Sequence, residues 1–179
     1  MFLSDREIIA AIKSWDISIS DFDTSRLQVA SYDILLGNRF LTFDDYKTPI
    51  IDPTKKILPT YKEIIIKDDE EFVLHPWLSL LGISKDYFWS DKYLIQLSGK
   101  SSLARIGLIV HNTAWLINPG HYLNIAFELC NLNSVPIILR PGMEIAQLLF
   151  AQLSSLPQQN YHEKWRYAQE NWISYKSKD

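Results

Sequence analysis

The first residues of the chain have the spacing of an amphipathic helix. Ser4 and Glu7 stand three positions apart, as in a capping box, where each side chain accepts a hydrogen bond from the other residue's backbone amide. Apolar residues then recur every three or four positions, at Ile8, Ile9, Ala11, Ile12 and Trp15. We therefore predict a helix from about residue 5 to residue 14.

After this helix the pattern changes to short apolar runs of strand length, separated by turn residues. We predict strands at 31–37, 62–66, 71–74, 93–97, 108–110, 124–129, 135–139 and 145–153. The first ends at Gly37, the second and third form a hairpin around Asp68-Asp69-Glu70, and the last two flank the turn Arg140-Pro141-Gly142. One short helix is expected at 101–105, where two serines precede helix-forming residues. Many short strands of this kind favour an all-β barrel or sandwich.

Composition restricts the classes of function. A chain of 179 residues is long enough for one domain with a sizeable core. Its net charge of −3 gives no reason to expect a nucleic-acid partner, so an anionic ligand needs a local positive cluster. Cys130 is the single cysteine, and it can make neither an internal disulfide nor a cysteine-based zinc site. No segment reaches the length of a membrane span, and we expect a soluble cytoplasmic protein.

One carboxylate interrupts the predicted strand 124–129. The side chains of a strand alternate between two faces, so Ile125, Phe127 and Leu129 share one face. Glu128 lies on the other face, with Asn124 and Ala126. Such a carboxylate either points to water, which is the commoner case, or lines a site and transfers protons.

Three familiar catalytic motifs are absent. Gly99-Lys100-Ser101 has the end of a phosphate-binding P-loop, but the position that requires the motif's first glycine holds Leu94. The chain has neither the zinc deaminase pattern His-x-Glu with Pro-Cys-x-x-Cys nor a Gly-x-Ser-x-Gly elbow. The helix that begins at Ser101 and Ser102 still suits phosphate through its free amides, with Lys100 beside it, although an ordinary surface helix has the same pattern.

The order of five segments resembles that of the dCTP deaminase family. They are GKSSLARIGL at 99–108, HNTA at 111–114, INPG at 117–120, FELCN at 127–131 and RPGM at 140–143. Residues 3–9, 30–33, 36–37 and 72–76 also resemble that family, so the likeness runs from Met1 to about Leu153. A chance match of all these segments in this order is very improbable.

This resemblance implies a fold, an assembly and an activity. The fold is all-β, a distorted β-barrel or jelly-roll of the dUTPase-like type with an N-terminal helix and a short internal helix. The assembly is a homotrimer with active sites between subunits. Residues 1–156 of each chain form the β domain, and the tail 157–179 closes over the site. The substrate is dCTP, with Mg²⁺ carried on its triphosphate, and dTTP is a feedback inhibitor of some members. The enzyme is a hydrolase of the C–N bond of a cyclic amidine, which forms dUTP and ammonia in nucleotide metabolism.

The resemblance also assigns roles to residues. Glu128 matches the family's proton-transferring carboxylate, while the Ala114 carbonyl and the Ser101 hydroxyl match groups that hold the attacking water. Arg105 matches an arginine that positions this carboxylate and stabilises charge on the ring. No zinc and no other protein-bound metal is expected, so hydrogen bonds alone orient the water. The remaining matches are substrate contacts: Lys100, Ser102, Asn112, Asn118, Tyr161, Lys164 and Gln169.

Four positions depart from the family's pattern. Asn118 stands where the family usually has aspartate, and Trp115 stands where bifunctional members usually have glycine. The Asn118 amide takes no proton at neutral pH, and the Trp115 indole fills space that glycine would leave open. Both changes therefore disfavour diphosphate release. Trp77 replaces a common glycine, and Gln169 lies one place late in the tail pattern. We therefore expect a monofunctional enzyme that stops at dUTP. The alternatives are a bifunctional deaminase that forms dUMP and pyrophosphate, and a non-catalytic, nucleotide-binding regulatory trimer.

Overall fold

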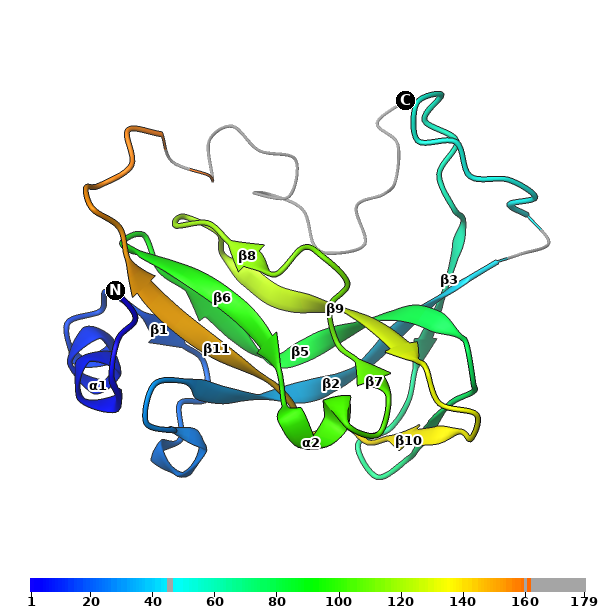
Figure 1. The fold of residues 1–179 in the computed structure, drawn as a ribbon, viewed down its shortest axis with the longest axis horizontal. Coiled ribbons are helices and arrows are strands. Elements are labelled where there is room, and N and C mark those ends of the chain that lie inside the picture. Colours follow the sequence, from blue (N-terminus) through cyan, green and yellow to red (C-terminus); the bar gives the residue numbers. More distant parts are fainter. Residues whose placement is uncertain (45–46, 160, 162–179) are drawn as a thin grey trace.

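The N-terminal helix is where the sequence predicts it. The computed structural model describes residues 1–44, 47–159 and 161 (Figure 1). Helix α1 spans Asp5–Lys13, and the Glu7 carboxylate accepts a hydrogen bond from the Ser4 amide at 2.8 Å. Ile8 and Ala11 on its apolar face are buried. The capping box and the helical spacing are both confirmed, and α1 lies at one end of the molecule (Figure 1).

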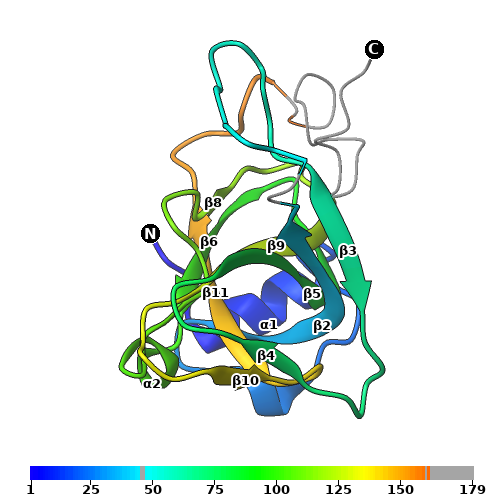
Figure 2. The ribbon, with the colours of Figure 1, turned by 90° about the vertical axis from the view of Figure 1, so that its right-hand side faces the viewer.

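The strands form one curled sheet and one small ribbon. The central order is β7-β9-β5-β2-β11-β6-β8, every pair is antiparallel, and β1 and β3 are added on β5 and β2. Figure 2 shows the sheet curling into a half-barrel, with α1 visible through its centre. The ribbon pairs β10 with β4. The strands are β1 Ser18–Ile19, β2 Tyr32–Phe43, β3 Tyr61–Ile65, β4 Phe72–Leu74, β5 Ser79–Trp89, β6 Tyr93–Gly99, β7 Leu108–Ile109, β8 Leu116–Ile117, β9 Leu123–Asn131, β10 Ile137–Leu139 and β11 Glu144–Gln152.

Two short helical turns complete the described chain. A 3₁₀ turn spans Thr24–Arg26, and α2 spans Ser101–Ala104 between β6 and β7. The short internal helix is therefore confirmed, within one residue of its predicted end. Together, the helices and strands make the mainly β architecture that the sequence predicts.

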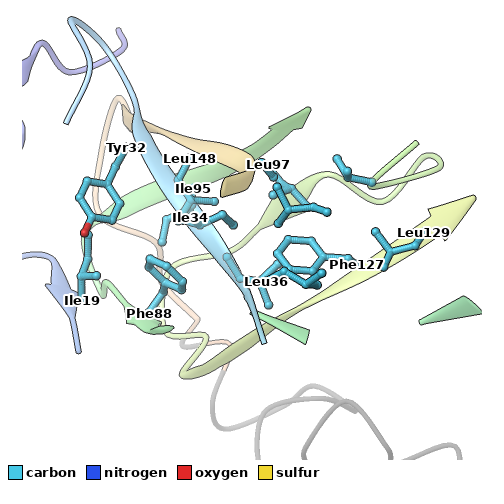
Figure 3. Packing of buried hydrophobic residues seen from close by; sticks show 14 of the residues in the cluster. Ile19, Tyr32, Ile34, Leu36, Phe88, Ile95, Leu97, Phe127, Leu129 and Leu148 are labelled. Carbon is cyan, nitrogen blue, oxygen red and sulfur yellow. The ribbon is translucent and has the colours of Figure 1, made fainter. Parts of the chain in front are cut away.

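The concave face of the sheet carries the core. Ile34, Leu36, Phe127 and Leu129 lie close together inside the curl (Figure 3), and each is fully buried. Burying side chains of this size stabilises a fold by roughly 1.5–3 kcal/mol each. The alternation in β9 is confirmed, because Ile125, Phe127 and Leu129 are buried while their neighbours are partly exposed. Glu128 is thus held on the opposite face of the sheet.

A second, smaller apolar cluster covers part of that opposite face. It joins Leu41 and Ile83 with the partly buried Tyr61, Leu81 and Ala126. Leu81 is the residue that pairs with Glu128 across β5 and β9. The carboxylate therefore borders apolar side chains.

One predicted strand boundary and one predicted strand pairing are wrong. Gly37 does not end a strand, because β2 continues through it to Phe43. A Cβ atom at Gly37 would lie 2.9 Å from the Ile83 carbonyl oxygen, so this glycine permits a close approach of β2 and β5. The predicted hairpin at 62–74 is also wrong, since β3 pairs with β2 and β4 pairs with β10.

Candidate functional site

Glu128 is held by the loop that follows β7. Its amide donates to the Val110 carbonyl at 3.1 Å. Its Oε2 atom accepts a hydrogen bond from the Asn112 amide at 2.6 Å. Oε1 has no hydrogen bond to any residue that the structure describes. One carboxylate oxygen is therefore anchored and the other remains available to a ligand or water.

Two more of the predicted site residues, Ala114 and Asn118, lie on either side of the short strand β8. Ala114 and Asn118 are both exposed. Trp115 lies between them, with its side chain partly open to solvent, and its carbonyl accepts a hydrogen bond from the Leu97 amide at 2.8 Å. This contact and the pairing of β8 with β6 tie this segment to the sheet. The structure therefore brings Asn112 to Glu128 and places Ala114 and Asn118 on either side of β8.

Helix α2 presents the second group of predicted residues. Ser101, Ser102 and Arg105 are exposed on it or directly after it. It is only four residues long, and the Leu103 and Ala104 amides already donate to the Lys100 carbonyl at 3.0 Å. Because so short a helix has little dipole, its N-terminus adds little positive charge for an anionic ligand. The positive charge here is that of Lys100.

Lys100 is fixed by two carboxylates. Its ammonium lies 2.7 Å from Asp33 Oδ2 and 2.5 Å from Glu144 Oε2. Burial on its own lowers the pKa of Lys100, but the hydrogen bonds to Asp33 and Glu144 raise it above the ordinary value overall. One member of this cluster has a signal in the sequence, because Asp33 ends one of the segments that resemble the family. Nothing in the sequence pattern pointed to Glu144.

These two groups are not joined within one chain. Across residues 1–44, 47–159 and 161, no hydrogen bond or ion pair links Ser101 or Arg105 with Glu128. The described chain thus offers one carboxylate on β9, Glu128, and a separate group beside α2 in which Lys100 is paired with Asp33 and Glu144. An active site that needs both at one substrate is consistent with the expectation of sites shared between subunits.

Tyr161 is the one predicted site residue of the tail that the structure describes. The Tyr161 ring lies against the His121 ring, with centroids 4.5 Å apart. His121 follows Gly120, whose amide donates to the Ser90 carbonyl at 2.8 Å. Lys164 and Gln169 lie outside the described residues.

Among the residues that the structure describes, no three His, Cys, Asp or Glu side chains come together in a group that could hold a metal ion. None of the helices described is both long and apolar enough to cross a membrane.

Comparison with known proteins gives consistent results. The model of the family described as dCTP deaminase-like matches residues 2–153. A protein of Beutenbergia cavernae named "dCTP deaminase, dUMP-forming" is 40% identical over 162 residues, which cover 90% of this chain and 84% of that protein. A protein of the same name from Halobacterium salinarum is 37% identical and covers 92% of this chain and 87% of its own length.

Solved structures share the fold. The 2′-deoxycytidine 5′-triphosphate deaminase of Agrobacterium tumefaciens superimposes with a TM-score of 0.63 at 19% identity, over 83% of this chain and just 46% of that one. A mutant dUTPase from phage phi11 of S. aureus, described for its coordination of a structural Mg(II) ion, has a TM-score of 0.50 at 12% identity over 84% of this chain and 98% of its own. These similarities confirm the dUTPase-like type of fold that the sequence predicts. With a family model that matches residues 2–153 and relatives 37–40% identical along nine-tenths of its length, the chain belongs to the dCTP deaminase-like family.

Proposed function

We propose that this chain hydrolyses the exocyclic C–N bond of dCTP, with Glu128 as the group that transfers protons. The observation that carries the proposal is the anchored carboxylate, with Oε2 held by the Asn112 amide at 2.6 Å. A fixed carboxylate with its second oxygen open is suited to act as base and then as acid. Relatives named dCTP deaminase support the choice of substrate.

The reaction follows from this placement. Water adds to C4 of the cytosine ring while Glu128 takes one of its protons. Glu128 passes that proton to N3, and then carries the proton of the new C4 hydroxyl to the amino group. The C4–N4 bond breaks, ammonia leaves, and the C4 carbonyl of uracil forms. In the proposal, the Ala114 carbonyl and the Ser101 hydroxyl hold the water, and Arg105 stabilises charge that develops on the ring.

We assign the triphosphate to Lys100 and the residues of α2 beside it. Lys100 supplies a charge, Ser102 supplies a hydroxyl, and the substrate carries its own Mg²⁺. Asn112, Asn118 and Tyr161 are the proposed sugar and base contacts, together with Lys164 and Gln169 of the tail. Because the chain belongs to the dCTP deaminase-like family, whose members we expect to be trimers, we propose a homotrimer whose sites lie between subunits. Light scattering should give a mass of about three 20.8 kDa chains.

For the product, we propose dUMP and pyrophosphate, because the relatives named above are dUMP-forming enzymes. A second candidate product is dUTP. It is favoured by Asn118, which cannot act as a base, and by the Trp115 indole beside it. These two residues are the reason that the sequence predicts a monofunctional enzyme.

One experiment separates these possibilities. Purified protein is incubated with Mg²⁺ and dCTP, and dUTP, dUMP and pyrophosphate are resolved by chromatography. We expect dUMP and pyrophosphate to appear in equal amounts. Accumulation of dUTP alone would support the monofunctional reading, and binding of dCTP without turnover would support the regulatory trimer.

A further inference from the structure

The two carboxylates that hold Lys100 differ in their exposure to water. The Asp33 side chain is 4% exposed, whereas the Glu144 side chain is 46% exposed. Both reach the same ammonium, at 2.7 and 2.5 Å. The ammonium therefore has one buried partner and one partner at the surface.

Asp33 is built to stay in place. It lies in β2 between the fully buried Tyr32 and Ile34. Its Oδ2 atom also accepts a hydrogen bond from Gln28 Nε2 at 3.0 Å. A buried carboxylate that loses its cation keeps the full cost of its desolvation, so this pair resists separation.

Glu144 is free to leave. It is the first residue of β11, just after the turn at Gly142, and its side chain is half in water while the next residue, Ile145, is buried. An ion pair so open to solvent contributes little to stability, because water and salt replace it readily. Rotation of Glu144 into solvent would expose the outer side of the ammonium and leave Asp33 in contact with it.

We propose that Glu144 is a displaceable counter-ion of Lys100, which competes with the phosphate groups of the substrate for the ammonium. This inference rests on the proposed function, in which Lys100 binds phosphate. One cation beside two carboxylates gives the cluster a net charge of −1, which opposes an approaching triphosphate. Glu144 is thus a positioning residue that acts through Lys100 and sets the affinity of the site for phosphate.

The first test is Glu144→Gln with inorganic tripolyphosphate as the probe, measured by isothermal titration calorimetry. Removing the charge of a half-exposed pair should tighten binding about twofold to fivefold. The KM for dCTP should fall by a similar factor, with a smaller change in kcat. Glu63→Gln is the matched control, because Glu63 is also half-exposed, in a 2.6 Å pair with Arg39. It should leave the affinity for tripolyphosphate unchanged.

A double-mutant cycle tests whether the effect passes through Lys100. In Lys100→Met, the further change Glu144→Gln should have no effect on the affinity for tripolyphosphate. As a single variant, Glu144→Asp keeps the charge and should bind tripolyphosphate like the parent protein. Unchanged or weaker binding by Glu144→Gln would overturn the proposal. A gain that persists in the Lys100→Met background would also overturn it. So would the absence of measurable tripolyphosphate binding by both the parent protein and Glu144→Gln. Failure of the parent protein to turn over dCTP would instead overturn the proposed function, since the tripolyphosphate comparison needs no turnover.

Discussion

Two regions of the molecule hold a cation against carboxylate, and they differ in how far they are closed. Arg26 and Asp86 pair at 2.5 Å with side chains 8% and 0% exposed, and the guanidinium lies over the Tyr32 ring at 4.9 Å. Burial on its own lowers the pKa of Arg26, but Asp86 raises it above the ordinary value overall. Lys100 has one buried partner and one partner in water. A closed pair can only support the fold, whereas an open pair can exchange its partner for a ligand.

The largest effect that we expect comes from Glu128, the proposed proton-transferring residue, which belongs to neither ion pair. Glu128→Gln keeps the shape of the side chain but removes the proton-transferring group. The kcat for deamination should fall by about 10²–10⁴-fold, as is typical of general acid–base groups. The free energy of unfolding should change little, because the carboxylate is only partly buried. Near-parental turnover by this variant would exclude the proposed role of Glu128.

Breaking the closed pair of Arg26 and Asp86 should lower the free energy of unfolding. Asp86→Asn leaves the Arg26 guanidinium buried without its counter-charge, and we expect a loss of about 3–5 kcal/mol in the free energy of unfolding. Urea denaturation followed by tryptophan fluorescence measures it. Replacing both residues, Arg26→Met with Asp86→Leu, should cost less than Asp86→Asn alone. A loss below about 1 kcal/mol, the range of exposed pairs, would place this pair with the open one.

The third prediction concerns the product and the loop beside Glu128. If Asn118 and Trp115 limit pyrophosphate release, Asn118→Asp with Trp115→Gly should raise the rate of dUMP formation from dUTP by about tenfold or more. The assay supplies dUTP with Mg²⁺ and follows phosphate through added pyrophosphatase. No gain in dUMP would show that these two residues do not set the product.

The sequence predicted the elements whose signal is local. The capping box at Ser4 and the alternation around Glu128 depend on neighbours in the chain, and both are confirmed. The central strand β5 was missed, since its run from Ser79 to Trp89 contains Gly82, Lys85 and Asp86, which interrupt an apolar pattern. Asp86 is buried only because Arg26, 60 residues earlier, meets it.

The candidate site divides in the same way. Its residues were found through short segments that resemble a family, and Asn112 and Glu128 do come together. The partner of Lys100 at Glu144 was not predictable, because 44 residues separate them and β11 meets β6 only in the folded sheet. The sequence proposes which residues bear chemistry, and tertiary pairing decides which charges meet.

The fourth prediction is a pH dependence of the stability that the Lys100 ion pairs contribute. The pKa of Lys100 is raised in the folded chain, so its ion pairs stabilise the fold fully below the ordinary lysine pKa, about 10.4. That contribution is lost as the pH rises through the raised value. The difference in the free energy of unfolding between the parent protein and Lys100→Met should therefore be constant from about pH 7 to 9 and shrink only above about pH 10.4. A change between pH 7 and 9 would contradict this assignment.

The smallest effect is expected from a third pair, which is open on both sides. Arg39 Nη2 lies 2.6 Å from Glu63 Oε1 across β2 and β3, with side chains 32% and 37% exposed. Water competes for both partners, and exposed pairs contribute only about 0–1 kcal/mol. Glu63→Gln should thus lower the free energy of unfolding by less than about 1 kcal/mol, and 0.5 M salt should remove most of that difference by shortening the screening length to below about 8 Å. Urea denaturation at low and high salt measures both numbers. A loss as large as that of Asp86→Asn would mean that distance, and not closure from water, decides what an ion pair contributes in this sheet.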